Sequence, residues 1–188
     1  MLNDNPTNQQ VLKHTALMDA GKRLFIEHGY QKINAKQIAA EANVATGTFY
    51  RYFEDKASLL LAIWDRDFQH HLPHVNPSMP VWQTIQATIQ QELDDLAEFG
   101  LLNVVTSVSL YNEAVAEKLA AENAESRLVL ERILKTAQAT GQIRNDINLR
   151  LAAWAIMTIV HELVLQDEAQ HTQVTDLENL ISAMLSPR

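Results

Sequence analysis

The chain has 188 residues, of which 47% are hydrophobic, and it contains five glycines, five prolines and no cysteine. This composition favours a mostly helical protein of one large or two small domains, and the lack of cysteine excludes disulfide and thiolate chemistry. The formal net charge of −8 argues against indiscriminate binding to nucleic acid.

The first predicted helix runs from about Gln9 to His28 and ends at Gly29. Glycine suits this end because it adopts the left-handed conformation that closes many helices. The apolar stripe of the helix recurs at helical spacing and consists of Leu12, Ala16, Leu17, Ala20, Leu24 and Phe25. The residues before it are polar and contain no apolar signal region, so we expect no export segment and a cytoplasmic location.

A short helix, a tight turn and a second short helix are predicted over residues 35–53. Asn34 can cap the first of these helices, and Asn43 tolerates the left-handed conformation that would end it. In the second helix Phe49 and Phe53 recur at a spacing of four and should face the core, whereas hydroxyls, a glycine and two tyrosines are left outside. Such a helix-turn-helix lays its second helix in a groove of duplex DNA, so the sequence predicts DNA binding.

A fourth helix is predicted from Lys56 to about residue 72, and it connects the helix-turn-helix to the rest of the chain. Prolines interrupt the helical pattern over residues 72–80. Further helical segments should begin near Pro80, Leu101, Asn112, Leu149 and Thr175. The predicted fold class is therefore all-α, with about nine helices in two domains, residues 1–55 and residues 56–188.

Residues 151–165 are apolar nearly all the way round a helix, so one buried face cannot account for them. A membrane span needs about 20 apolar residues, and this run is shorter and contains His161 and Glu162. We expect one face to pack on its own domain and the other to join the last helix in a four-helix bundle with a second subunit. The predicted interface residues are Trp154, His161, Leu165, Leu177, Ile181 and Met184.

The segment from about Leu12 to Phe68 resembles the DNA-binding domain of the TetR family of transcriptional regulators. The residues that carry the resemblance are Gly29, Tyr30, Ile38, Ala39, Val44, Gly47, Thr48, Tyr50, Tyr52, Phe53, Lys56, Leu59 and Leu60. Two positions depart from the family pattern. The family commonly has glycine at the position of Asn43 and serine or threonine at the position of Ala45. Asparagine tolerates the left-handed conformation, but alanine removes the expected side-chain cap of the next helix.

Eight residues are predicted to contact DNA: Lys36, Thr46, Gly47, Thr48, Tyr50, Arg51, Tyr52 and Lys56. The two lysines should reach phosphates, and the resemblance implies phosphate contacts for Thr48, Tyr50 and Tyr52. Thr46 and Gly47 would lie nearest the base edges, with Arg51 as a candidate for a guanine contact. The alternative is a three-helix packing motif without a role in DNA binding, but exposed hydroxyls, tyrosines and lysines serve no purpose in a core.

The resemblance implies a homodimeric, sequence-specific regulator, usually a repressor, that binds a pseudo-palindromic operator and responds to a small molecule. This effector, apolar or amphipathic, would bind in the C-terminal helical domain and press on the fourth helix. The predicted pocket residues are Trp64, Ile89, Leu93, Val105, Val108 and Met157. The sequence contains no nucleophile motif, phosphate-binding glycine loop or paired-carboxylate motif, so we expect neither an enzyme nor a cofactor.

Several histidines could suggest other chemistry, namely His70, His71 and His74. A proline falls between them and the segment borders a loop, so solvated histidines are expected and no metal site is predicted. His161 does not begin a zinc-protease motif because the fourth residue after it is Leu165, and it is either a polar group of the dimer interface or an effector contact. The alternatives to a regulator are a helical small-molecule-binding protein with a vestigial DNA unit and a metal-dependent enzyme.

Overall fold

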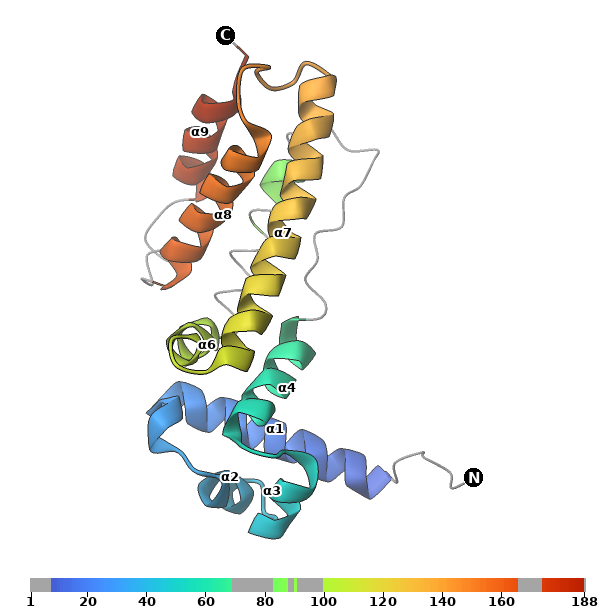
Figure 1. Cartoon of the computed structure of the whole chain (residues 1–188), viewed down its shortest axis with the longest axis vertical. Coiled ribbons are helices and arrows are strands. Elements are labelled where there is room, and N and C mark those ends of the chain that lie inside the picture. Colours follow the sequence, from blue (N-terminus) through green and yellow to red (C-terminus); the bar gives the residue numbers. More distant parts are fainter. Residues whose placement is uncertain (1–7, 69–82, 88–89, 91–99, 166–173, 188) are drawn as a thin grey trace. The chain divides into compact units, whose positions relative to one another are not determined.

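The computed structural model describes residues 8–68, 83–87, 90, 100–165 and 174–187 (Figure 1). In these ranges the secondary structure consists of helices and one 3₁₀ turn, without a strand, which confirms the predicted all-α class. None of the helices in these ranges is long and apolar enough to cross a membrane. The chain forms two compact units, and each is described by itself.

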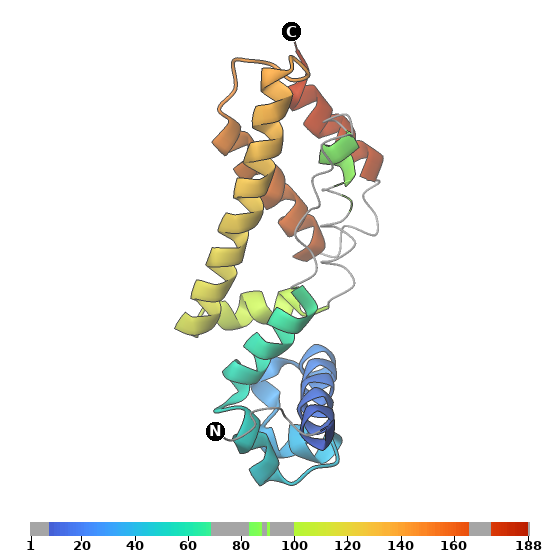
Figure 2. The same cartoon turned by 90° about the vertical axis from the view of Figure 1, so that its right-hand side faces the viewer.

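The first unit contains residues 1–69 and 100–119, so it extends beyond the predicted boundary at residue 55. Its helices are α1 (Asn8–His28), the 3₁₀ turn η1 (Tyr30–Lys32), α2 (Ala35–Glu41), α3 (Thr46–Tyr52), α4 (Lys56–Phe68), α6 (Leu102–Ser109) and the start of α7 (Glu113–Ala139). Helix α4 crosses α1, and α2 and α3 complete the helix-turn-helix (Figures 1 and 2). The core of these helices consists of Leu17, Phe25, Ile38, Phe49, Leu59, Leu60 and Ile63.

The predicted local signals of the helix-turn-helix are present. The side chain of Asn34 accepts a hydrogen bond from the Gln37 amide at 3.0 Å, and the Gln37 side chain accepts one from the Asn34 amide at 2.9 Å. Asn43 has a φ of 54°, the left-handed conformation that ends α2. Ala45 gives α3 no side-chain cap, and only its carbonyl accepts a hydrogen bond, from the Thr48 amide at 2.8 Å.

Two further contacts explain why residues 100–119 belong to the first unit. Gly100 has a φ of 58°, and a Cβ atom placed there would lie 3.2 Å from Cδ1 of Ile26 on α1. Lys118 on α7 forms an ion pair with Asp65 on α4.

The start of α7 is capped locally. Asn112 accepts a hydrogen bond from the Val115 amide at 3.1 Å.

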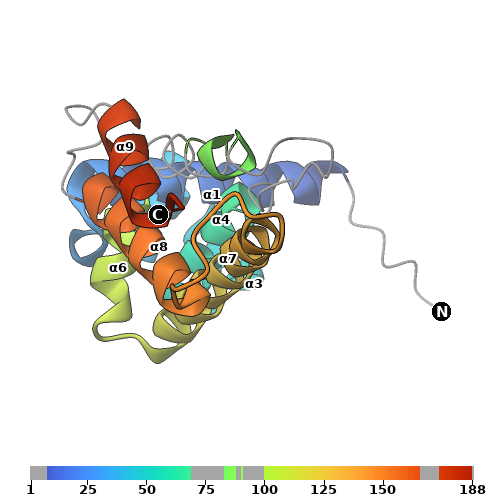
Figure 3. The same ribbon diagram turned by 90° about the horizontal axis from the view of Figure 1, so that it is seen from above.

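The second unit contains residues 70–99 and 120–188. Helix α9 (Val174–Leu185) lies beside α8 (Leu149–Leu165) (Figures 1 and 3). The described part of the unit also contains the remainder of α7 and the helical residues 83–87 and 90. Its buried side chains include Ile85, Leu130, Ile133, Leu134, Ile143, Ile156, Val160, Leu177, Ile181 and Leu185. A backbone hydrogen bond of 2.9 Å from the Arg144 amide to the Leu185 carbonyl fastens the α7–α8 connection to the end of α9.

Candidate nucleic-acid interface

Helix α3 has one buried and one exposed face. The Phe49 ring is fully buried and that of Phe53 nearly so, and the two ring centroids lie 5.7 Å apart. On the opposite side Thr46, Gly47 and Arg51 are exposed, and 60% of Tyr50 is accessible. Burial of each phenylalanine contributes about 1.5–3 kcal/mol, so the aromatic residues hold the helix in place and its polar face stays available to a ligand.

Gly47 lies at the start of this exposed face. A Cβ atom placed there would meet no other atom within 4 Å, so packing inside the chain does not require glycine. The missing side chain removes bulk from the end of α3 that would approach the floor of a DNA groove. That Thr46 and Gly47 lie nearest the base edges stays a prediction.

Tyr52 has a different position from the one predicted for a phosphate ligand. It is half-buried, and its hydroxyl donates a hydrogen bond of 3.1 Å to the Gln10 carbonyl on α1. Its ring also lies edge-on to the imidazole of His14, with centroids 5.5 Å apart. Because a phosphate oxygen can only accept, and the single hydroxyl proton is already donated, Tyr52 in this conformation fastens α3 to α1 and is not a phosphate donor.

Lys56 is held by a residue that the sequence analysis did not place at the site. Its Nζ donates to the Tyr30 carbonyl at 2.8 Å and lies 4.3 Å from the centroid of the Tyr30 ring. Burial lowers the pKa of Lys56, and burial together with Asp55 and Tyr111 raises the pKa of Tyr30 to about 12. An ammonium group carries three donors, so Lys56 retains protons for a phosphate in a fixed position.

A groove of about 550 Å³ runs beside these groups. Its lining includes Asn34 at the start of α2, Tyr50 on α3, and both Tyr30 and Lys56. Asn112, in the α6–α7 connection, lines the same groove. The groove therefore brings a phenol and an ammonium group together beside α3 and the start of α4, and the carboxylates of Glu54 and Asp55 line it as well.

Lys36 is a further cationic residue of the helix-turn-helix. It is exposed in the first turn of α2 and forms no ion pair with any residue that the structure describes. The nearby Arg23 differs, because its Nη2 lies 2.5 Å from Oε1 of Glu41 and its charge is neutralised inside the unit. Thr48 is half-buried on α3, so it is less accessible than Tyr50.

The comparison with known families agrees with this geometry. The family model described as "Bacterial regulatory proteins, tetR family" matches residues 17–63, which include α2, α3 and most of α1 and α4. The chain is a TetR-family transcriptional regulator. This family is non-enzymatic, and the prediction that the chain is not an enzyme is confirmed.

Three comparisons show which proteins this TetR-family regulator resembles. It is 25% identical to the fatty acid metabolism regulator protein of Bacillus subtilis (strain 168) over 158 residues, which cover 81% of both chains. The fatty acid degradation regulator FadR from Bacillus halodurans has a similar structure, with a TM-score of 0.76, 21% identity and 96% of both chains covered. FadR from Bacillus subtilis in complex with stearoyl-CoA has a TM-score of 0.72 and 22% identity, and 89% of this chain and 95% of that one are covered.

The TetR-family regulator exposes a row of side chains on α8, opposite its buried face. Leu151, Trp154 and Thr158 lie on this row, and 50% of Trp154 is accessible. Leu151 and Trp154 also border a groove of about 820 Å³, whose other lining residues are Ala124, Arg127, Leu128, Glu131, Asn148 and Arg150. The exposed tryptophan and the leucines beside it form an apolar patch on this face.

Helix α9 requires a correction to the predicted interface. Leu177 and Ile181 are 3% and 0% exposed, so they pack in the core of the second unit and not against another subunit. The exposed residues of the helix include Asp176, Asn179, Leu180 and Ala183. His161 and Met184 are half-buried, and Leu165 ends α8.

The predicted pocket residues of the TetR-family regulator fall into different parts of the chain. Trp64, Val105 and Val108 are buried in the first unit, and Met157 is half-buried in the second. The remaining two predicted residues, Ile89 and Leu93, lie outside the described residues. The pocket therefore stays a prediction.

Two buried polar atoms in the described residues have no hydrogen-bond partner there, Oγ1 of Thr106 on α6 and Nε2 of His161 on α8. Burial lowers the pKa of His161, although the neighbouring Glu162 opposes this effect. The imidazole is therefore favoured in its neutral form. A buried polar atom without a partner costs free energy, so each of these two groups is a candidate for an effector contact.

The histidines that could have suggested a metal site, His70, His71 and His74, lie outside the described residues. In the parts of the chain that are described, no group of three or more His, Asp or Glu side chains could hold a metal ion.

Proposed function

We propose that this regulator is a homodimeric repressor that binds a pseudo-palindromic operator in the cytoplasm and leaves it when a long-chain acyl-CoA binds. The exposed face of α3, backed by the buried Phe49 and Phe53, is the observation that carries operator binding. In a dimer, two such helices would enter successive major grooves about 34–36 Å apart. Directed contacts from Lys36, Tyr50 and Lys56 would supply the affinity, since the overall charge of −8 opposes binding.

The exposed face of α8 supports the dimer. Leu151 and Trp154 would be covered by the same face of a second copy, and Leu180 on α9 would extend the contact. A two-fold axis brings identical patches together, so one apolar face suffices for both subunits. This arrangement retains the predicted four-helix bundle but builds it from the outward faces of α8 and α9.

The similarity to fatty acid regulators supports the choice of effector. A long-chain acyl thioester combines an apolar chain with polar groups, and the buried Nε2 of His161 could bind one of those groups. For a 100-fold release from the operator, the effector must favour the non-binding state by about 2.7 kcal/mol. The effector experiment should therefore be able to measure a 100-fold change in operator affinity.

The test uses a duplex selected by the full chain from a random-sequence pool. Fluorescence anisotropy of this duplex should show saturable binding, and stearoyl-CoA should release it while coenzyme A alone does not. Stearate as a third ligand shows whether the thioester is required. Operator binding that stearoyl-CoA leaves unchanged would reject the acyl-CoA effector, and a chain that selects no duplex would leave the small-molecule-binding alternative.

A further inference from the structure

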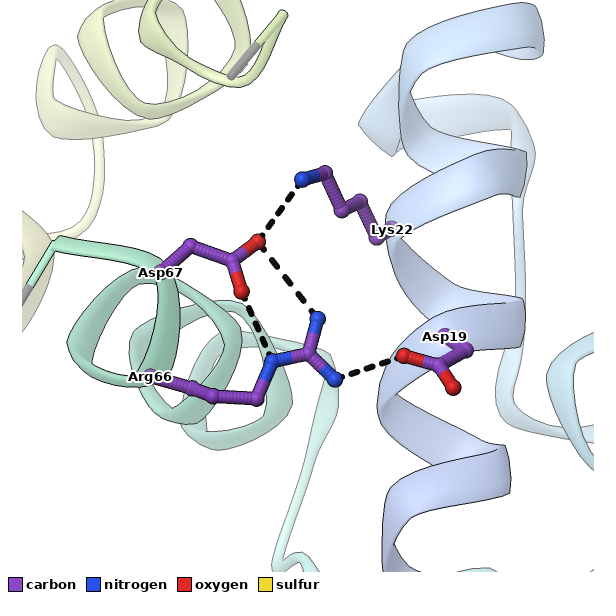
Figure 4. A network of polar contacts seen from close by, with 4 residues as sticks. All are labelled: Asp19, Lys22, Arg66 and Asp67. Atoms are coloured by element: carbon purple, nitrogen blue, oxygen red, sulfur yellow. Dashed lines mark hydrogen bonds and ion pairs between the residues drawn. The ribbon is translucent and has the colours of Figure 1, made fainter. Parts of the chain in front are cut away.

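The last turn of α4 carries three consecutive charged residues, Asp65, Arg66 and Asp67, and two of them bind α1 (Figure 4). Nη1 of Arg66 donates to Oδ1 of Asp19 at 2.6 Å, and its Nε donates to Oδ1 of Asp67 at 2.7 Å. Nζ of Lys22 lies 2.8 Å from Oδ2 of Asp67. We refer to Asp19, Lys22, Arg66 and Asp67 together as the ionic clasp.

The clasp is partly shielded from water. The side chain of Asp67 is only 14% exposed, whereas that of Asp19 is 59% exposed. Burial alone would raise the pKa of Asp67, but hydrogen bonds from Arg66 and Lys22 outweigh it and lower this pKa. Asp67 therefore stays ionised between two cations, and the α1–α4 attraction is screened less than that of a fully exposed pair.

The clasp lies beside the closest approach of the two helices. A Cβ atom on Gly21 of α1 would lie 2.7 Å from Cδ2 of Leu59 and 3.2 Å from Cδ1 of Ile63 on α4. Asp19 and Lys22 flank this glycine on α1. The close contact at Gly21 fixes where α4 meets α1, and the ion pairs in the last turn of α4 add a second, directional contact between the two helices.

We propose that the ionic clasp fixes the tilt of α4 on α1 in the DNA-binding conformation, so that Arg66 and Asp67 are positioning residues for operator binding. Neither residue lies on the exposed face of α3 or in the groove beside Lys56. They act through α4. This helix begins at Lys56, and a short turn after Phe53 joins it to α3. This role extends beyond the phosphate and base contacts of the head, by which we mean α1, η1, α2, α3 and α4.

When the clasp is broken, α4 spreads over several tilts, and each tilt displaces Lys56 and the end of α3 relative to the rest of the head. Only the fraction of molecules with the original tilt then binds at full strength, and the apparent affinity falls by that fraction. A separate ion pair of α4, that of Asp65 with Lys118 on α7, limits the remaining freedom.

The experiment compares Asp67→Asn with Glu41→Gln in the full chain. Both substitutions remove a carboxylate that binds α1, but Glu41 pairs with Arg23 and connects α2, whereas Asp67 connects α4. The probe is the duplex that the wild-type chain selects from a random pool. Stoichiometric titration measures the active fraction of each preparation, so a loss of folded protein is not counted as a loss of affinity.

Asp67→Asn should weaken operator binding about fivefold, which corresponds to about 1 kcal/mol, and Glu41→Gln should change it less than about twofold. Adding Lys22→Met to Asp67→Asn should cause little further loss, because the two residues act through one pair. Asp67→Glu, which keeps the charge, should recover at least half of the lost binding free energy. Such a rescue would not follow from a purely steric role.

Equal affinities of wild type, Asp67→Asn and Lys22→Met would overturn the proposal, as would a loss for Glu41→Gln that matches the loss for Asp67→Asn. If Asp67→Asn does not fold, the exposed Asp19→Asn removes only the negative charge that faces Nη1 of Arg66, and it should still weaken binding by about twofold. Unchanged affinity of that variant would likewise reject the clasp. A wild-type chain that selects no duplex would instead count against operator binding itself.

Discussion

Substitution of Lys36 by alanine tests whether the cationic side chains of the head bind phosphates. Three cationic side chains are the candidates: Lys36 is exposed in the first turn of α2, Arg51 is exposed on α3, and Lys56 lines the groove beside Tyr50. If each neutralises one phosphate, a dimer neutralises about six, and the logarithm of its affinity should fall with the logarithm of salt concentration with a slope of about −5.

Lys36→Ala removes one of these contacts from each head, so the slope should become shallower by about one per head and about two per dimer. Between 50 and 200 mM salt the wild type should then lose about 1,000-fold in affinity and the variant about 100-fold. Fluorescence anisotropy across this range measures both slopes. The loss of affinity should be similar for all DNA sequences, because a phosphate contact carries no base information.

Lys135→Ala is the matched control. Lys135 is an exposed lysine on α7 in the second unit, so its removal changes the net charge by the same amount without touching the head. Its slope should equal that of the wild type. A slope that Lys36→Ala leaves unchanged, or that Lys135→Ala changes equally, would refute the reasoning and remove Lys36 from the DNA contacts.

Three further predictions concern stability and assembly. Trp154→Glu should convert the dimer to a monomer in light scattering, because it places a charge on the proposed interface, whereas Leu110→Glu, at a position 84% exposed in the first unit, should leave the dimer intact. Asn43→Ala should lower the free energy of unfolding by about 1 kcal/mol in a denaturant titration, and Asn43→Gly should not, because φ is 54° there. Burial and Arg66 lower the pKa of His14 in the folded state, so the unfolded chain binds the proton first and stability falls as pH drops below about 6.5. His14→Gln should show a smaller fall between pH 6.5 and 5 in the same titration, and an equal fall would contradict this origin.

Local signals let the sequence predict the helix-turn-helix. A cap such as Asn34 depends on atoms three residues away, and the positive φ of Asn43 depends on the end of its own helix. The spacing of Phe49 and Phe53 likewise fixes which face of α3 is buried. Each of these features is a matter of short-range geometry, so the residues alone determine it.

The partners of Tyr52 and Lys56 could not be predicted in this way. Tyr52 binds a carbonyl 42 residues away and Lys56 one 26 residues away, and only the packing of α1 and η1 brings those carbonyls within reach. Polar character and spacing made both residues candidates for phosphate contacts. The carbonyl partner removes that role from Tyr52 and gives Lys56 a fixed position.

In the second unit, too, some features follow from the sequence and others only from the tertiary structure. The sequence by itself determined that α8 and α9 are helices and that α8 has more apolar surface than one core face can bury. It could not decide which side of α9 faces inward, because Leu177, Leu180 and Ile181 are all apolar and differ only in direction. The tertiary structure buries Leu177 and Ile181 and exposes Leu180, since the side with the better fit to its neighbours gains most from leaving water.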